Sequence, residues 1–113
     1  MGKGKLKQGD LAGAISDFDQ AIAVDPKYAT AYNDRGNVRK ALGDLAGAIS
    51  DYDQAIVVDP KKVEAYYNRG FARKAQEDLT SAVADLTCYL KLAPNAADRA
   101  VVEKTIADLA RAT

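Results

Sequence analysis

The stretch that decides the fold is GDLAGAISDFDQAI at residues 9–22, which recurs as GDLAGAISDYDQAI at residues 43–56. The two copies differ at one position, where Phe18 becomes Tyr52, and they begin 34 residues apart. The prolines of the chain keep the same interval: Pro26, Pro60 and Pro94. A fixed period of this length indicates a repeat array, in which each copy forms one structural unit.

One period of the sequence contains two predicted helices. From Tyr28 to Leu42, large and apolar residues recur at helical spacing. Gly43-Asp44 then interrupts the pattern, because glycine tolerates the left-handed geometry that ends a helix and aspartate caps the next one. The second helix is predicted over Leu45–Val58, where the apolar residues form one stripe. Asp59-Pro60 closes it, since the residue before proline resists helical geometry.

Neighbouring repeats must stack, because one helical hairpin cannot bury both of its faces. The array therefore predicts a solenoid with a continuous core. The same pattern predicts a helix over Leu11–Val24. After Pro94, residues 97–112 are predicted as one amphipathic helix that covers the last apolar face, as the end of a repeat array requires.

The residues at the repeated positions resemble the tetratricopeptide repeat (TPR) family. The family pattern has an aromatic residue early in the first helix and a glycine four residues later. Alanine, an aromatic residue and alanine follow in the second helix, and proline comes last. The first full repeat supplies Tyr32, Gly36, Ala48, Tyr52, Ala55 and Pro60, and the second supplies Tyr66, Gly70, Ala82, Leu86, Tyr89 and Pro94.

This resemblance implies an all-α fold, a right-handed α-solenoid of TPR helical hairpins. About two and a half repeats plus a C-terminal capping helix are expected from the period. We expect a single TPR domain over residues 1–113. Its parts are a truncated first repeat at 1–26, full repeats at 27–60 and 61–94, and the capping helix at 95–113.

The last full repeat departs from the family pattern at Leu86 and Tyr89, where an aromatic residue and an alanine are usual. Tyr89 is large where a small residue is expected. Ala100, at the place of the early aromatic residue in the next helix, is small. We predict a volume-conserving exchange in which Tyr89 fills the space that Ala100 leaves.

Arginine and aspartate also recur with the repeat. Arginine replaces the leucine that the family usually has before the glycine, at Arg35 and Arg69, and a second arginine follows four residues later, at Arg39 and Arg73. Aspartate recurs in the second helices at Asp17, Asp51 and Asp85. We predict an arginine–aspartate ladder between stacked helices, which fixes their register more than it adds stability. The alternative is a set of surface charges that do not pair, since exposed ion pairs contribute little.

The composition argues against catalysis and against several classes of ligand. The chain has no histidine, the commonest general base and metal ligand, and Cys88 is its only cysteine. We therefore expect no catalytic residue, no metal site and no cofactor, and the chain is not expected to be an enzyme. Sixteen basic residues offset sixteen acidic ones, so the basic excess of a nucleic-acid binder is missing. No apolar run reaches the ~20 residues of a membrane span and no signal-peptide pattern is present, so we expect a cytoplasmic protein without membrane contact.

The family resemblance implies a concave groove lined by the first helices of successive hairpins. Asparagine side chains bond a peptide backbone, and Tyr67 and Phe71, one helical turn apart, offer an apolar platform. We therefore expect a protein or peptide partner, bound as a peptide or a helix; the alternative is that these residues only solvate the surface. Carried over by position, the groove is lined by Thr30, Asn33, Asp34, Asn37, Lys40, Glu64, Tyr67, Asn68, Phe71 and Lys74.

Some members of the family clamp the C-terminal carboxylate of chaperones with a lysine–asparagine pair, a second asparagine and a lysine–arginine pair. Asn37 and Asn68 match the two asparagines, whereas Asn33 stands at the place of the first lysine. Asp98 and Val102 replace the lysine–arginine pair. Because an aspartate repels a carboxylate, we expect no binding of chaperone tails.

The N-terminal repeat is incomplete, since only residues 2–8 remain for the last turns of its first helix. The helix over Leu11–Val24 would then lack cover on one side, and an exposed apolar patch invites association. The alternative function is therefore a self-assembling unit that forms a homodimer through this end, unless the sequence is a piece of a longer array. The patch comprises Leu11, Ala14, Phe18 and Ala21.

Overall fold

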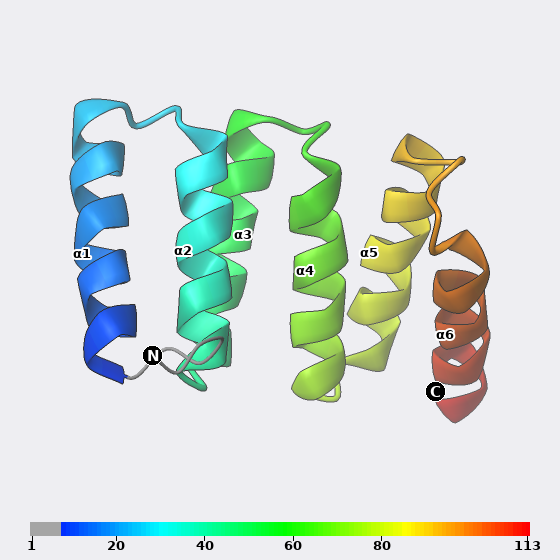
Figure 1. Cartoon of the computed structure of the whole chain (residues 1–113). Helices are drawn as coiled ribbons and strands as arrows, with labels where there is room; N and C mark the ends of the chain where they lie inside the picture. Colours follow the sequence, from blue (N-terminus) through cyan, green and yellow to red (C-terminus); the bar gives the residue numbers. More distant parts are fainter. Residues whose placement is uncertain (1–7) are drawn as a thin grey trace.

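The computed structural model describes residues 8–113, and its secondary structure in this range is entirely helical. Residues 1–7 lie outside the described part. The stretch at 2–8 that was predicted to form the last turns of a first helix therefore lies almost entirely outside it. The described helices follow one another along the molecule (Figure 1): α1 (Gln8–Val24), α2 (Ala29–Ala41), α3 (Leu45–Val58), α4 (Val63–Ala75), α5 (Leu79–Leu92) and α6 (Arg99–Ala112).

Each helix packs against the next one along the chain, and α2 also contacts α4 directly. The pairs α2–α3 and α4–α5 form two successive hairpins, flanked by α1 and α6 (Figure 1). The architecture is therefore the all-α solenoid that the repeat predicts, and buried apolar residues form two clusters, one on α3 and α4 and one on α5 and α6. None of the described helices is long and apolar enough to cross a membrane.

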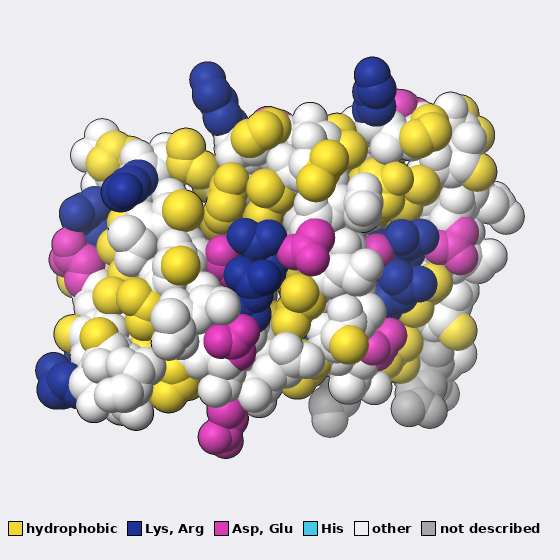
Figure 2. Space-filling view, turned by 180° about the vertical axis from the view of Figure 1, so that it is seen from behind, with side chains coloured by type: hydrophobic (Ala, Val, Ile, Leu, Met, Phe, Trp, Pro, Cys, Tyr) yellow, Lys and Arg dark blue, Asp and Glu magenta, His cyan; other side chains and the backbone are white. Residues whose placement is uncertain are grey.

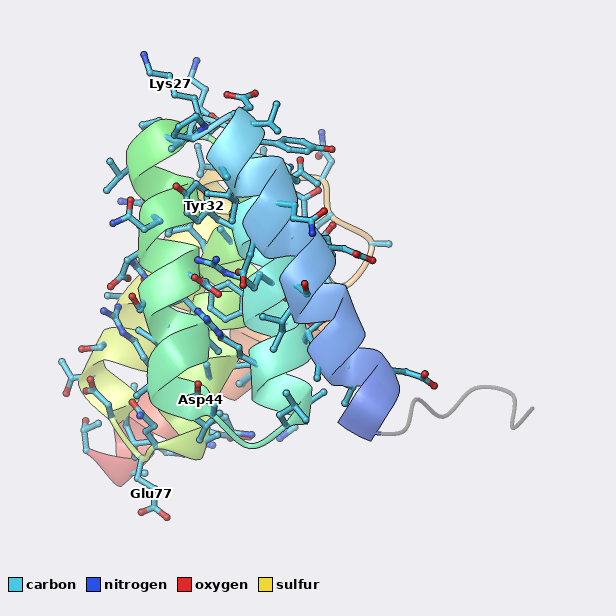
Figure 3. All side chains as sticks on the ribbon, turned by 90° about the vertical axis from the view of Figure 1, so that its left-hand side faces the viewer. Lys27, Tyr32, Asp44 and Glu77 are labelled. Atoms are coloured by element: carbon cyan, nitrogen blue, oxygen red, sulfur yellow. The ribbon has the colours of Figure 1, made fainter. Side chains whose placement is uncertain are left out.

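The connections between helices gather at the two ends of the molecule. The prolines occupy equivalent junctions, since Pro26 lies between α1 and α2, Pro60 between α3 and α4, and Pro94 between α5 and α6. Figure 3 shows Lys27, beside the first proline, at the end opposite to Asp44 and Glu77, which belong to the turns within hairpins. This regular placement follows from the 34-residue period.

Helix boundaries agree closely with the sequence pattern except at the N-terminal side. The helix predicted over Leu45–Val58 coincides with α3, and α2 is one residue shorter at each end than predicted. By contrast, α1 begins at Gln8, so Gly9-Asp10 lies within its first turn. The same residue pair forms a turn at 43–44, which shows that a Gly-Asp pair permits a turn without requiring one.

The two turns within hairpins share one backbone geometry. Gly43 adopts a φ of 87°, in the left-handed region that glycine enters without steric cost. Glu77, at the equivalent position of the next hairpin, adopts a φ of 64°. Both turns are closed by the same pair of backbone hydrogen bonds, each 2.9 Å long. Asp44 and Asp78 then cap the following helices, because their side chains accept a hydrogen bond from the N–H three residues later.

Close approach of α2 to α3 depends on a glycine that faces an aromatic ring. A Cβ added at Gly36 would lie 2.6 Å from Cε1 of Tyr52, so only glycine fits. Tyr52 is fully buried, and its hydroxyl donates to Oδ1 of Asn37 at 2.6 Å. Burial, with the nearby Asp51 carboxylate, raises the pKa of Tyr52 to about 12. Between α4 and α5, Gly70 and the fully buried Leu86 repeat this contact.

The predicted arginine–aspartate ladder is confirmed for Asp51. This carboxylate is buried and accepts from Arg35 at 2.7 and 3.0 Å and from Arg39 at 2.9 Å. Arg35 also reaches Asp19 of α1 at 2.6 Å, which ties two repeats together. Asp17, the third aspartate predicted to belong to the ladder, is exposed and takes part in none of the ion pairs of the described residues. Asp19 lies one period before Asp53, which makes the equivalent contact with Arg69.

The ladder repeats one period later around the buried Asp85. Arg69 donates to it at 2.7 and 2.9 Å, Arg73 at 2.9 Å, and Arg69 also reaches Asp53 of α3 at 2.8 Å. Burial lowers the pKa of Arg69, but its hydrogen bonds to Asp85 and Asp53 outweigh this effect and leave the pKa raised. On the face seen in Figure 2, the basic side chains in the middle of the surface form separate groups with acidic side chains beside them, whereas other basic side chains project singly at the edges.

Helix α6 covers the open side of α5. Val102 and Leu109 are buried and join the same cluster as Leu90. Ala100 is exposed, so the prediction that Tyr89 fills a space left by Ala100 is wrong. An exposed alanine leaves no interior space, and Tyr89 is positioned by other contacts, described below.

Candidate functional site

Two hollows lie along α2 and α4. The larger one, called here the groove hollow, has a volume of about 460 Å³. It contains every predicted groove residue except Lys40, Phe71 and Lys74. Its walls are made by Thr30, Asn33, Asp34, Asn37, Lys62, Glu64, Tyr67, Asn68, Tyr89 and Asp98.

The three remaining predicted residues line the second hollow, which has a volume of about 420 Å³. Lys40 comes from the end of α2, whereas Phe71 and Lys74 come from the last turns of α4. The Nζ of Lys74 lies 5.9 Å from the centre of the Phe71 ring. Glu77 in the following turn completes this hollow together with Ala75. The predicted groove is therefore divided into two parts with different charges.

Paired amides occupy the middle of the groove hollow. Asn68 of α4 donates from Nδ2 to Oδ1 of Asn33 on α2 at 3.0 Å, and Asn33 is only 5% exposed. Because Oδ1 of Asn68 and Nδ2 of Asn33 take no part in that bond, an acceptor and a donor are left for a ligand. Asn37 is held one turn further along α2 by the hydroxyl of the buried Tyr52. These bonds give the amides fixed orientations before any ligand arrives.

An aromatic cluster forms one wall. The Tyr67 ring centre lies 4.8 Å from that of Phe71 and 5.0 Å from that of Tyr89, in tilted and edge-on arrangements. All three rings are half-buried against the cluster between α5 and α6. Tyr67 and Phe71 are in ring contact, as the predicted platform requires, but Phe71 lines the second hollow, and in the groove hollow Tyr67 is joined by Tyr89 of α5.

Charge in the groove hollow is predominantly acidic. Asp34, Glu64 and Asp98 contribute carboxylates, whereas Lys62 is the one cationic side chain among the lining residues. The Nζ of Lys62 donates to Oγ1 of Thr30 at 2.8 Å rather than to a carboxylate. None of the ion pairs formed within residues 8–113 involves the three lining carboxylates.

Tyr89 joins the aromatic wall to this acidic group. Its hydroxyl donates to Oδ1 of Asp98 at 2.8 Å. This hydrogen bond, followed by burial and the charges of Asp98 and Glu64, raises the pKa of Tyr89 to about 12.

The residues predicted to line the groove omit three that do so, Lys62, Tyr89 and Asp98, although Asp98 was placed at a position of the chaperone-tail clamp. Each comes from outside the two first helices to which the family pattern assigns the groove. Lys62 immediately precedes α4, Tyr89 projects from the second helix α5, and Asp98 immediately precedes α6. The unusual size of Tyr89 was visible in the sequence, and it was the one feature that could have indicated its role.

The positions of the chaperone-tail clamp fall into different environments. Asn33, Asn37, Asn68 and Asp98 line the groove hollow, as their places in the repeat imply. Val102, however, is 1% exposed and packs in the core. This position therefore presents no side chain to a ligand in the hollow.

The residues expected to form a self-association patch are only partly accessible. Leu11 is 8% exposed and therefore buried within the single chain, which contradicts its assignment to an open patch. Ala14, Phe18 and Ala21 are half-buried. Packing of α1 against α2 explains this difference, because it covers part of the face that was expected to be open.

A family profile described as TPR repeat matches residues 2–43 and 36–77. These matches extend over more than half of the sequence, and the chain belongs to the tetratricopeptide repeat family. No curated protein matches the chain.

Solved structures of TPR domains resemble the fold closely. The first TPR of Spaghetti (RPAP3), bound to the HSP90 peptide SRMEEVD, is 27% identical with a TM-score of 0.83, covering 93% of this chain and 81% of that chain. The NMR structure of the first TPR domain of human RPAP3 is also 27% identical, with a TM-score of 0.84 and coverages of 93% and 83%. The Arabidopsis OM64 TPR domain is 29% identical, with a TM-score of 0.82 and coverages of 89% and 84%.

Proposed function

We propose that this chain is a protein-interaction module that binds a peptide or a helix in the groove hollow. The observation that carries the proposal is the combination of oriented amides and a half-buried aromatic wall in one concavity of about 460 Å³. Aromatic rings supply contact area at little cost in conformational freedom, and amides bond to a peptide backbone. The similar domain of Spaghetti holds an HSP90 peptide, which supports a peptide as the class of ligand.

Binding rather than catalysis fits the chemistry of the lining residues. The sequence contains no histidine to act as a general base near neutral pH. In the groove hollow, the hydrogen bond that the Tyr89 hydroxyl donates to Asp98 raises the pKa of Tyr89 to about 12, so this hydroxyl stays protonated near neutral pH. We therefore infer a binding role for these groups.

The acidic peptide held by the Spaghetti domain is not the expected ligand of this chain. Asp98 lies in the hollow where the family clamp has a cation, and Val102 is buried. Asn33 supplies no charge at the remaining position. We expect no heat of binding in calorimetry with the peptide SRMEEVD, and micromolar binding would contradict this prediction.

The proposal is tested by selecting binders from a phage-displayed library of random dodecapeptides on immobilised protein. Wild type is expected to enrich related sequences, and Tyr67→Ala is expected to lose them. Val57→Ala, an exposed change on α3, is the control and should retain them. Asn68→Ala provides a second groove variant, and circular dichroism establishes that each variant is folded. Absence of enrichment by wild type, or equal enrichment by both folded groove variants, would overturn the proposal.

A second candidate function is self-association through α1. Ala14, Phe18 and Ala21 are half-buried, whereas their equivalents in α3, Ala48, Tyr52 and Ala55, are fully buried. This open apolar surface favours association with a second copy. Light scattering at tens of micromolar is expected to give the mass of a dimer for wild type and of a monomer for Phe18→Glu. A wild-type monomer would contradict this candidate.

A further inference from the structure

Unlike the ladder aspartates, the carboxylates of the groove hollow have no cationic partner among residues 8–113. The ladder aspartates, such as Asp51, are each matched by arginine at 3.0 Å or less. In the groove hollow, Asp34, Glu64 and Asp98 are neutralised by none of the ion pairs among residues 8–113, and the single lysine donates to a threonine. A concave wall with one sign of charge raises the local concentration of ligands with the opposite sign.

The aromatic wall next to these carboxylates suits the aliphatic stem of a basic side chain. Lysine and arginine have long aliphatic stems that pack on apolar surfaces while their charged ends remain with polar groups. Tyr67 and Tyr89 form such a surface, and the Tyr89 hydroxyl is bonded directly to Asp98. Aromatic faces also attract cations through their quadrupole. Apolar and acidic groups are therefore adjacent, as a basic side chain requires.

We propose that the groove hollow takes a peptide segment with a lysine or arginine side chain, whose cationic end lies among Asp34, Glu64 and Asp98. The stem of that side chain lies along Tyr67 and Tyr89, and the peptide backbone bonds to the amides of Asn33 and Asn68. This inference rests on the proposed function and specifies its ligand. The preferred charge is opposite to that of the acidic peptide bound by the Spaghetti domain.

The same dodecapeptide library tests this specificity with a charge-neutralised variant. The variant combines Asp34→Asn, Glu64→Gln and Asp98→Asn, which keep the size of each side chain and remove its charge. The control combines Asp10→Asn, Asp17→Asn and Glu103→Gln, all exposed and outside the groove hollow. Both variants change the net charge equally, so nonspecific attraction to the whole protein affects them alike.

Wild type and the control are expected to enrich peptides with a basic residue at a constant position. The neutralised variant should lose them, and a synthetic copy of the most enriched peptide should bind it about tenfold more weakly, as three partly exposed ion pairs imply. Enrichment of acidic or uncharged peptides that still depend on Tyr67 would overturn this inference and leave the proposed function standing. Unchanged binding by the neutralised variant would overturn it as well. Absence of any enrichment by wild type would overturn both this inference and the proposed function.

Discussion

At the scale of single residues, buried aspartates hold the register of the stack. Asp51 and Asp85 are only 2% and 3% exposed, and each accepts hydrogen bonds from two arginines. Such a cluster adds little net stability relative to an apolar core, but removal of one partner leaves uncompensated charge. The hydrogen bond to Asp51 raises the pKa of Arg35, so the guanidinium stays charged throughout the ordinary pH range.

Asp51→Asn is expected to lower the free energy of unfolding by about 3 kcal/mol, because Arg35 and Arg39 lose their shared anion in a buried setting. Asp17→Asn, at the equivalent but exposed position of α1, should change it by less than about 0.5 kcal/mol. Urea denaturation of the two variants beside wild type measures both values. Equal small losses would mean that the cluster does not act as a buried unit.

Gly36→Ala tests the close contact between α2 and α3. The added methyl would lie 2.6 Å from a ring carbon of Tyr52, whose hydroxyl is tied to Asn37, so we expect a loss of about 1–3 kcal/mol. Gly13→Ala, with no atom within 4 Å of the added carbon, should instead stabilise by up to about 1 kcal/mol. Thermal unfolding compares the two. A neutral Gly36→Ala would contradict the tight contact.

At the scale of helices and turns, repetition made the architecture predictable. Alternation of apolar stripes with Gly-Asp and Asp-Pro signals located α2 and α3 to within one residue. The beginning of α1 was not predictable in the same way, because Gly9-Asp10 is the same residue pair as Gly43-Asp44 but lies within a helix. Local sequence allows both conformations there.

The turn before α5 contains a strained residue that the sequence pattern did not reveal. Glu77 adopts a φ of 64° because the repeat requires left-handed geometry at the place of Gly43. Glu77→Gly is expected to stabilise the protein by about 0.5–1 kcal/mol, since glycine enters this region without steric cost. Gly43→Ala should destabilise it by about 1–2 kcal/mol. Urea denaturation measures both, and a destabilising Glu77→Gly would show that this side chain makes contacts that outweigh the strain.

At the scale of the whole molecule, the site combines residues that one repeat unit cannot bring together. The residues on α2 and α4 were predictable because each occupies a defined place in the period. Lys62 and Tyr89 were not, since they come from a loop and a second helix, whereas Asp98 was indicated only by its place in the clamp pattern. Their position in the hollow results from stacking, and stacking also separates the acidic groove hollow from the second hollow with its two lysines.

Direct mapping of the ligand on the protein tests the central claim that this concave face binds a peptide. ¹⁵N-labelled protein is titrated with the most enriched dodecapeptide, and amide chemical shifts are followed by NMR. The largest changes are expected at the side-chain amides of Asn33, Asn37 and Asn68 and at the neighbouring backbone of α2 and α4. Largest changes on α1, or on the exposed surfaces of α3 and α5, would contradict the account.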